Sequence, residues 1–395
     1  MVAPEEARAL AARAIDVLGY QVLIGDGMLD VLGEVCRRVG PSHRYAIISD
    51  DEVAKHWLAP ATMAISRAIP RAVLSTATIP PGESSKTREQ WTRLTDWLLA
   101  EGAGRDTTVI ALGGGVVGDL AGFVAATYLR GVPVVQVPTS LLAMVDASIG
   151  GKTGVDTPRG KNLVGSFHQP AAVVADPATL STLPAAHLRA GIAEVVKHGA
   201  ITDATQFRLA ASWGATVHRA LQRESGVQEG IDWAGGPTLD VITQSVATKA
   251  AVVNADPLER GRRQILNAGH TVAHALEREM DFALLHGEAV AIGLVVEAGL
   301  GEAAGITAVG TAHALRSALG GAGLPTRVPA GIDPVRLIDA MRSDKKSRAG
   351  SLAFALLAAI GQPAGNDDAG WSIHLEEATV RQVLSSPSRA IDEEE

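Results

Sequence analysis

Residues 109–122, Val-Ile-Ala-Leu-Gly-Gly-Gly-Val-Val-Gly-Asp-Leu-Ala-Gly, are a glycine-rich turn between an expected strand and an expected helix. Gly113, Gly115 and Gly118 have the G-x-G-x-x-G spacing of phosphate-binding turns. Glycine lets backbone N–H groups approach an anion closely, and the helix N-terminus adds a favourable dipole. Residues 133–140 contain no acidic residue of the kind that binds ribose in a standard dinucleotide fold. The stretch predicts a non-standard, Rossmann-like nucleotide or phosphate site, with a merely tight turn as the alternative.

Outward from this turn, short β-rich runs alternate with helical stretches between Tyr45 and about Asp176. Such alternation is typical of a parallel sheet covered by helices. Apolar residues at helical spacing predict a helix over Ser85–Ala100. The expected strands are Tyr45–Ser49, Ala72–Ser75, Thr107–Leu112, Val132–Val137 and Ala172–Ala175.

After Pro184 the chain changes to long segments rich in Ala, Leu, Val and Glu, which favour helices. We therefore predict an α/β nucleotide-binding domain over residues 1–184, an all-α metal- and substrate-binding domain over 185–384, and a solvated acidic tail over 385–395. Gly-rich, charged residues 224–237 are expected to form a surface loop. The expected helices are Ala185–Ala200, Leu239–Val253, Gln264–Met280 and Ala289–Glu302.

Composition and charge exclude several classes of function. The 395 residues carry 35 Lys and Arg against 43 Asp and Glu, a net charge of −8, so no bulk positive field is available to bind nucleic acid or an anionic membrane. One cysteine, Cys36, cannot form an intramolecular disulfide and fits a reducing compartment. The first residues lack the features of a secretory signal, and no apolar run approaches the roughly 18 residues of a membrane span. We expect a cytoplasmic protein.

A glycine-punctuated polar region follows the fourth expected strand, between Pro138 and Gln169. Loops at the carboxyl ends of strands are where open α/β sheets bind ligands. Lys152 and Lys161 could bind phosphate, and Asp146 could orient or deprotonate a hydroxyl. The alternative is a solvated polar loop.

Three histidines of the helical half have metal-binding spacing. His270 and His274 are four residues apart on one helical face, and His286 follows after a short break. Neutral imidazoles with one carboxylate form a usual catalytic zinc set, for which Glu194 and Glu288 are the nearest carboxylates. Spacing alone leaves open which two histidines are ligands, and packing or surface roles remain the alternative.

Basic residues lie on the same half of the chain. Lys197, Lys249 and Arg263 fall on separate helical segments, and Lys345 and Lys346 follow further on. Taken singly, each is expected to be a surface charge. Together with a metal, they would suit a small substrate that carries both a phosphate and a carboxylate.

Taken together, these motifs resemble the 3-dehydroquinate synthase family, within the sugar-phosphate cyclase superfamily. The number of these motifs and their order along the chain are specific to that superfamily. The resemblance runs from about residue 80 to about residue 350. The segments that carry it are Gly113–Phe123, Tyr128–Val132, Val137–Ala143, Val145–Gly154, Gly160–Pro170, Gly191–Gly199, Leu266–Thr271 and Leu285–Gly293.

The resemblance implies an NAD-binding α/β domain, a helical metal domain and a homodimer. It implies zinc, with cobalt as an alternative, held by Glu194, His270 and His286. Catalytic residues would be Lys197, His274, Asp146 and Asn267. Substrate would be bound by Arg130 of the neighbouring subunit, Lys152, Asn162, Lys249, Arg263, Lys345 and Lys346. NAD would contact Glu83, Lys86, Gly114, Gly115, Val116, Val117, Gly118, Asp119, Thr139, Ser140, Lys152, Lys161, Thr179 and Thr182.

The implied reaction is a carbon–oxygen lyase step of the shikimate pathway, and so of aromatic amino acid biosynthesis. It converts the phosphorylated sugar acid 3-deoxy-D-arabino-heptulosonate 7-phosphate (DAHP) into 3-dehydroquinate and phosphate. Transient oxidation by NAD, phosphate elimination, reduction, ring opening and an intramolecular aldol closure would make up the sequence of steps, so NAD is regenerated.

Three other functions compete with this one. A cousin cyclase acting on a neutral sugar phosphate would not need Lys249 and Arg263. A metal-dependent polyol dehydrogenase would consume NAD stoichiometrically, and a non-catalytic binding protein would have no reason to keep the histidines together with Glu194 and Lys197.

A few positions depart from the family's usual pattern. Ser140 replaces the second of two threonines and keeps the hydroxyl, and His198 replaces a common tyrosine beside Lys197. Ala268 and the pair Val272-Ala273 change the packing expected around the histidine helix. None of these changes removes a residue that would contact metal, NAD or substrate.

Overall fold

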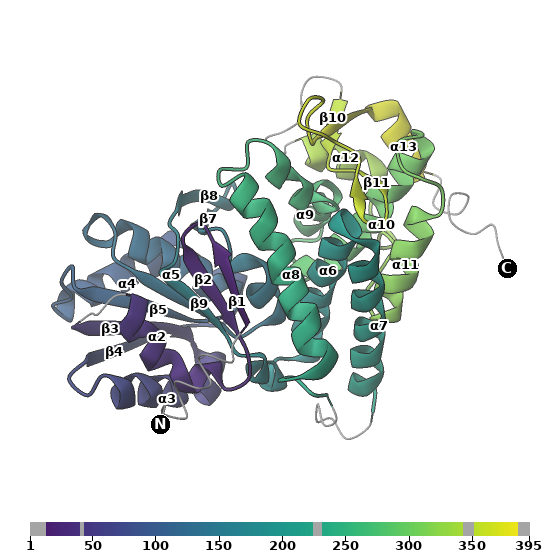
Figure 1. Cartoon of the computed structure of the whole chain (residues 1–395). Coiled ribbons are helices and arrows are strands. Elements are labelled where there is room, and N and C mark those ends of the chain that lie inside the picture. The colour runs from purple at the N-terminus through teal and green to yellow at the C-terminus, as the bar shows by residue number, and fades with distance from the viewer. Residues whose placement is uncertain (1–12, 40–42, 224–230, 343–350, 386–395) are drawn as a thin grey trace. The chain divides into compact units, whose positions relative to one another are not determined.

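The computed structural model describes residues 13–39, 43–223, 231–342 and 351–385 (Figure 1). Contacts divide the chain into two compact units. The first comprises Met1–Pro184 and Asp232–Asn254, and the second comprises Ala185–Ile231 and Ala255–Glu395. The predicted tail lies outside the described residues except for Ser385, which ends a helix.

The first unit is built on a seven-stranded sheet in the order β1-β2-β9-β6-β5-β3-β4. All neighbours in it pair in parallel except β1 and β2, which form an antiparallel hairpin at one edge. The strands of this sheet are β1 (Arg13–Val17), β2 (Tyr20–Ile24), β3 (Arg44–Asp50), β4 (Val73–Ile79), β5 (Thr107–Gly113), β6 (Val134–Pro138) and β9 (Ala172–Ala175). A separate antiparallel hairpin is formed by β7 (Lys152–Thr157) and β8 (Gly160–Phe167).

Helices cover both faces of the sheet, because alternate strand residues point to opposite sides. Ala46 and Ile48 belong to one apolar cluster, whereas Tyr45 and Ile47 belong to the other. The first cluster includes α4 (Arg88–Ala100) and α5 (Gly115–Thr127), and the second includes α2 (Leu32–Val39) and α3 (Asp51–Ala68). Short helical turns of this unit are η1 (Met28–Val31), η2 (Glu83–Ser85), η3 (Tyr128–Arg130), η4 (Ala143–Ala147) and η5 (Pro177–Thr182).

The glycine-rich turn connects β5 to α5, as predicted. Gly114 precedes the helix, and no described side chain caps the first turn of α5. Gly118 lies inside α5, where it allows close packing: a Cβ there would come 2.8 Å from Oε1 of Gln136, whose Nε2 donates to the Gly118 carbonyl. The turn therefore presents backbone N–H groups at the carboxyl end of a buried strand.

Helix α8 (Gly236–Ala255) packs with the first unit, although it follows part of the second unit in the chain. Arg13 pairs with Asp240 at 2.7 Å, and the Leu18 N–H donates to Asn254 Oδ1 at 2.8 Å. The change of composition after Pro184 predicts this helix in the second domain, because helical periodicity does not reveal which core a helix joins. The helix also begins at Gly236, so the loop predicted over 224–237 ends earlier than expected.

The second unit is mainly helical and also contains two short two-stranded sheets, β10–β13 and β11–β12, that the sequence analysis does not predict. Its core joins Leu276 of α9, Ile292 of α10, Ile338 of α12 and Phe354 of β10. The helices are α6 (Ala185–Thr202), α7 (Ala204–Leu221), η6 (Arg262–Asn267), α9 (His270–Glu279), α10 (His286–Ala303), α11 (Thr311–Gly321), α12 (Pro334–Arg342) and α13 (Glu377–Ser385). The strands are β10 (Ser351–Phe354), β11 (Leu357–Ala359), β12 (Gln362–Pro363) and β13 (Ile373–Glu376).

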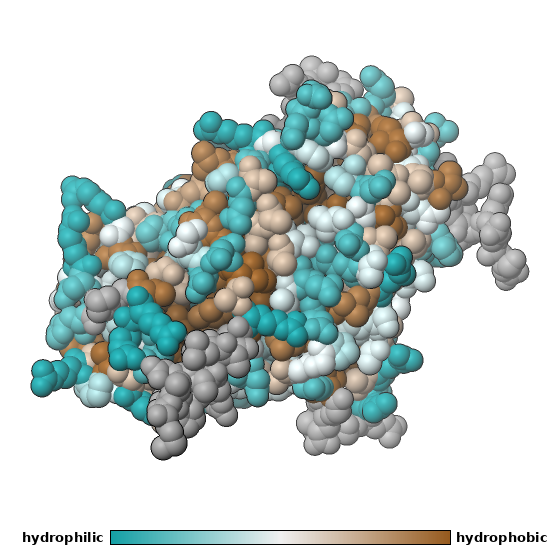
Figure 2. All heavy atoms as spheres, in the orientation of Figure 1, coloured by the Kyte–Doolittle hydropathy of each residue, from teal (hydrophilic) through white to brown (hydrophobic). Residues whose placement is uncertain are grey.

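The predicted fold class is confirmed: a parallel-sheet α/β unit is combined with a helical C-terminal region. All five predicted strands are present, although the hairpins β1–β2 and β7–β8 are not among them. Within the described residues, no helix combines the length and apolar character needed to cross a bilayer. The face shown in Figure 2 mixes hydrophilic and hydrophobic residues over its surface.

Candidate functional site

Three helices of the second unit, α6, α9 and α10, approach one another unusually closely at glycines. A Cβ at Gly287 would come within 2.0 Å of the Ala190 carbonyl oxygen, and one at Gly293 within 1.9 Å of the Gly269 carbonyl oxygen. Any larger residue at these positions would separate the helices. The close packing brings together one side chain from each helix: Glu194 of α6, His270 of α9 and His286 of α10.

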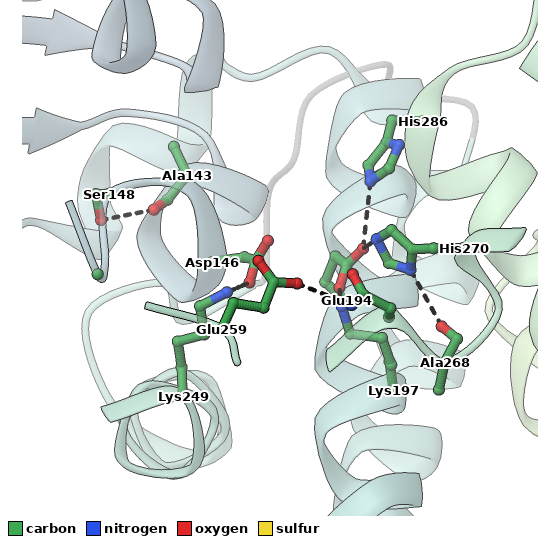
Figure 3. Close-up of polar contacts among 12 residues, drawn as sticks. Ala143, Asp146, Ser148, Glu194, Lys197, Lys249, Glu259, Ala268, His270 and His286 are labelled. Atoms are coloured by element: carbon green, nitrogen blue, oxygen red, sulfur yellow. Dashed lines mark hydrogen bonds and ion pairs between the residues drawn. The ribbon is translucent and has the colours of Figure 1, made fainter. Parts of the chain in front are cut away.

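Ligand atoms of Glu194, His270 and His286 all lie within 4.8 Å of one another, as metal ligands do. Nε2 of His286 lies 3.5 Å and Nε2 of His270 lies 3.8 Å from Oε1 of Glu194 (Figure 3). Ligands about 2.0–2.1 Å from a shared Zn²⁺ would have similar separations from each other. The three residues therefore fit a zinc ion.

The second ring nitrogen of each of these histidines is held by the protein. Nδ1 of His270 lies 3.1 Å from the Ala268 carbonyl oxygen, and Nδ1 of His286 lies 3.4 Å from the Glu277 carboxylate. Both oxygens are acceptors, so these contacts favour the tautomer with the proton on Nδ1 and the lone pair on Nε2. This is the tautomer that a metal requires of both residues.

His274 and Glu288, the other sequence candidates for ligands, do not join the group of three. The His274 ring lies edge-on to His270, with ring centroids 5.4 Å apart. Glu288 instead accepts from the Leu285 N–H at 3.0 Å, at the start of α10. Of the five residues that spacing left open, one carboxylate and two histidines thus lie together in the structure.

Three of the five basic candidates are buried, so the alternative that each is a surface charge is wrong for these three. Lys197 and Arg263 are each 1% exposed and Lys249 is 7% exposed. Lys197 forms an ion pair with Glu194 on the same helix, and Arg263 donates to the Pro257 carbonyl at 2.7 Å. Burial of a cation is costly unless it is paired, so these residues have a role beyond solubility.

Lys249 and Asp146 form an ion pair within the first unit. Asp146 belongs to η4 and Lys249 to α8, and the pair is drawn in Figure 3. The resemblance implies that Lys249 binds substrate and that Asp146 is catalytic. Their contact brings the two assignments together at one place.

A second buried network of this unit surrounds Lys86, which is only 3% exposed. Its ammonium lies 2.6 Å from Asp119 and 3.7 Å from Glu83, and Lys161 lies 3.9 Å from the same Glu83 oxygen. Burial lowers the pKa of Lys86, but Asp119 and Glu83 outweigh it, so the net shift is upward. Four residues predicted to contact NAD are therefore brought into one network.

The other predicted NAD residues lie at the ends of neighbouring strands. Gly113 pairs with Pro138, so the turn from Gly114 lies beside Thr139 and Ser140. Thr182 accepts from Nε1 of Trp57 at 2.9 Å, whereas Thr179 is buried in η5. The remaining members, Val116 and Val117, lie in the first turn of α5, and Val117 packs in the core.

Three predicted substrate residues lie on exposed parts of the first unit: Arg130, Lys152 and Asn162. Arg130 has φ +67° and Asn162 has φ +54°, both in the left-handed region that residues other than glycine rarely adopt. Such strain concentrates at binding sites. Lys345 and Lys346 lie outside the described residues, so their assignment stays a prediction.

Two acidic residues of the second unit are missing from the set predicted from the sequence. Glu259 has φ +58° and accepts from Nδ2 of Asn267 at 2.8 Å. Glu277 is buried and faces His286. The heptad-like spacing of Glu277 from His270 could have suggested a shared helix face, but nothing in the sequence marks Glu259.

Asp156 of β7 interacts electrostatically with Lys86 and Glu83, and it gives this network a pH dependence. Burial raises its pKa to about 6, while Lys86 and the Asn162 N–H oppose the rise. Its pKa in the unfolded chain is about 3.9, so between these values the folded state binds more protons and stability falls as pH rises. The Asp156→Asn variant should therefore gain Tm relative to the parent between pH 4 and pH 7.

Thermal melts of both proteins across that range test this expectation. The Asn side chain can still accept from the Asn162 N–H, so the turn of the hairpin is retained. A Tm difference that is the same at pH 4 and pH 7 would contradict the assignment of the titration to Asp156.

Comparison with known proteins adds independent findings. The family model described as 3-dehydroquinate synthase N-terminal matches residues 76–190, and the one described as 3-dehydroquinate synthase C-terminal matches residues 191–347. A curated 3-dehydroquinate synthase of Xanthomonas axonopodis pv. citri (strain 306) is 44% identical over 384 residues, which cover 95% of this chain and 98% of that protein.

Solved structures of sugar-phosphate cyclases share the fold. A 2-deoxy-scyllo-inosose synthase complexed with carbaglucose-6-phosphate, NAD+ and Co²⁺ is 25% identical, with a TM-score of 0.79, and the match covers 95% of this chain and all of that one. A 2-epi-5-epi-valiolone synthase from Streptomyces hygroscopicus subsp. jinggangensis 5008, with NAD+ and Zn²⁺ bound, is 26% identical, with a TM-score of 0.80 and 95% and 98% coverage.

Proposed function

The chain belongs to the 3-dehydroquinate synthase family, and we propose that the two clusters described above carry out that family's lyase reaction with NAD+ and zinc. The activity itself is that of a 3-dehydroquinate synthase, an enzyme of the shikimate pathway. The observation that carries the assignment of the site is the convergence of Glu194, His270 and His286 on three helices, with both Nε2 atoms facing one carboxylate oxygen.

Two sets of residues would hold the cofactors. Zinc fits Glu194, His270 and His286, with cobalt as an alternative. NAD+ fits the first turn of α5, which no described side chain caps, beside Thr139 and Ser140. When bound, NAD+ supplies a transient hydride acceptor and zinc supplies a Lewis acid for substrate hydroxyls.

The chain's own residues would bind and orient the substrate and manage its protons. Lys152, Asn162, Lys197 and Arg130 would bind the phosphate, and His274 would exchange a proton beside it. Arg263 and Lys249 would neutralise the carboxylate, and Asp146 and Asn267 would orient ring hydroxyls. Fixing one conformer of the opened intermediate would then favour the intramolecular aldol closure.

The buried cations favour a charged substrate over a neutral one. Lys249 and Arg263 are both withdrawn from water, and a substrate carboxylate would give each buried cation a further anionic partner. We therefore propose DAHP, which carries a carboxylate as well as a phosphate. We also propose that the enzyme is cytoplasmic and that it forms a homodimer. The exposed Arg130, in the left-handed region of φ, is suited to reach a neighbouring subunit.

A direct assay tests the substrate assignment. Purified protein with Zn²⁺ and a catalytic amount of NAD+ is given DAHP or, in parallel, sedoheptulose 7-phosphate, and phosphate release and the carbocyclic product are followed. We expect turnover of DAHP well beyond the NAD+ supplied. Turnover of the neutral sugar phosphate alone would overturn the roles of Lys249 and Arg263, and net accumulation of NADH would indicate a dehydrogenase.

A further inference from the structure

Glu297 is a buried carboxylate of α10 that contacts the first turn of the histidine helix α9. It is 2% exposed. Its Oε2 accepts from the Gly269 N–H at 2.8 Å and its Oε1 accepts from the Val272 N–H at 3.1 Å. Each carboxylate oxygen thus satisfies one N–H group that the start of a helix leaves without an intrahelical partner.

The helix cannot provide this cap from its own N-cap residue. That residue is Gly269, at φ +80°, and glycine has no side chain to accept from the first turn. A Cβ at Gly269 would also come 2.8 Å from the Leu294 nitrogen of α10, so the close packing of the two helices requires glycine there. The capping function therefore passes to Glu297 of the neighbouring helix.

The two contacts enclose His270. Gly269 precedes it and Val272 follows it by two residues, so the hydrogen bonds of Glu297 fix the backbone on both sides of the histidine. Ala268, whose carbonyl oxygen faces Nδ1 of His270, is the residue before Gly269. Glu297 also belongs to the helix that begins at His286, so it joins the helices of both histidines.

We propose that Glu297 is a positioning residue for the metal site, one that sets the direction of the His270 ring by capping α9 from α10. The inference rests on the zinc site proposed above. A carboxylate is needed because both N–H groups require an acceptor. Glutamine would retain one acceptor oxygen and place its amide NH₂ against the other N–H.

Glu302 provides a matched control. It lies on the same helix and accepts from the Ala312 N–H at 2.8 Å, at the start of α11. The N-cap of α11 is also a glycine, Gly310, with no side-chain cap. Glu302→Gln therefore makes the same substitution at a carboxylate that contacts the start of a helix with none of the proposed site residues.

The experiment measures zinc affinity by chelator competition, and the Tm of the metal-free protein, for the parent, Glu297→Gln and Glu302→Gln. We expect Glu297→Gln to weaken zinc binding by about 10- to 100-fold, the range found for groups that orient metal-binding histidines. Its Co²⁺ form should show an altered visible spectrum. Glu302→Gln, which keeps an acceptor for the Ala312 N–H, should leave zinc affinity and the Co²⁺ spectrum as in the parent.

A Glu297→Gln variant that loses Tm yet binds zinc like the parent would overturn the proposal and leave Glu297 a purely structural cap. If this variant does not fold, Glu297→Asp, which keeps both oxygens but shortens the side chain, is measured in the same way. Parent-like zinc affinity in that variant would equally overturn the proposal. Failure of the parent itself to bind zinc would instead count against the proposed metal site.

Discussion

Replacing His270 with alanine is expected to abolish stoichiometric zinc binding and to lower turnover of DAHP by about a thousand-fold. One of three ligands is lost, and with it the several kcal/mol of transition-state stabilisation that a Lewis acid supplies, where about 4 kcal/mol corresponds to that factor. The Lys197–Glu194 ion pair remains, so no buried charge loses its partner and the fold should persist. Metal content by mass spectrometry and phosphate release measure the two effects.

His187→Ala is a suitable control for this variant. His187 is an exposed histidine of α6, the helix that also carries Glu194. It should keep one equivalent of zinc and the parent's turnover. The proposed ligand set fails if His270→Ala also retains its zinc and its rate.

The His274→Ala variant should separate catalysis from metal binding. His274 lies beside His270 without joining the three converging ligands, so zinc should remain at one equivalent. Loss of a positioned proton donor or acceptor slows a reaction by about 10²- to 10⁴-fold, and we expect phosphate release to fall by that amount. Metal analysis together with single-turnover phosphate release tests both parts.

The contrast between the two histidine variants tests whether His270 is a metal ligand and His274 a proton donor or acceptor. Added free imidazole should partly restore phosphate release in His274→Ala, because it can exchange the missing proton. In His270→Ala, where the missing group is a ligand, imidazole should restore phosphate release only if it also restores bound zinc. Loss of zinc from His274→Ala to the same extent as from His270→Ala would contradict the proposed role of His274.

The parallel sheet was predictable because its signals are local. Strands such as Thr107–Gly113 and Ala172–Ala175 are short apolar runs between turn residues, and the glycine turn marks the strand-to-helix step directly. The edge hairpin β1–β2 was missed because Arg13–Val17 is charged and largely exposed, which hides a strand from any apolar pattern. Strands β10 and β13 are also too short to show a clear two-residue alternation of apolar and polar side chains.

Some features of the candidate site were also predictable from local sequence, whereas others depend on tertiary packing. Histidines and their glycines were marked by spacing, but the selection among Glu194, Glu288 and three histidines depended on how α6, α9 and α10 pack. The burial of Lys197 and Arg263 could not be read from sequence, because a charged residue in isolation is expected at the surface. Glu297 was not foreseen either, since its partners are backbone N–H groups that no residue type announces.

The membership of α8 in the first unit has a consequence for how the chain is made. Residues 1–184 leave the ribosome first, yet the unit that they begin also contains Asp232–Asn254. Since chains grow at about 5–20 residues per second, several seconds pass before α8 is available. Until then Asp146 lacks Lys249 as its partner. The first unit therefore completes its set of contacts only after part of the other unit has been synthesised.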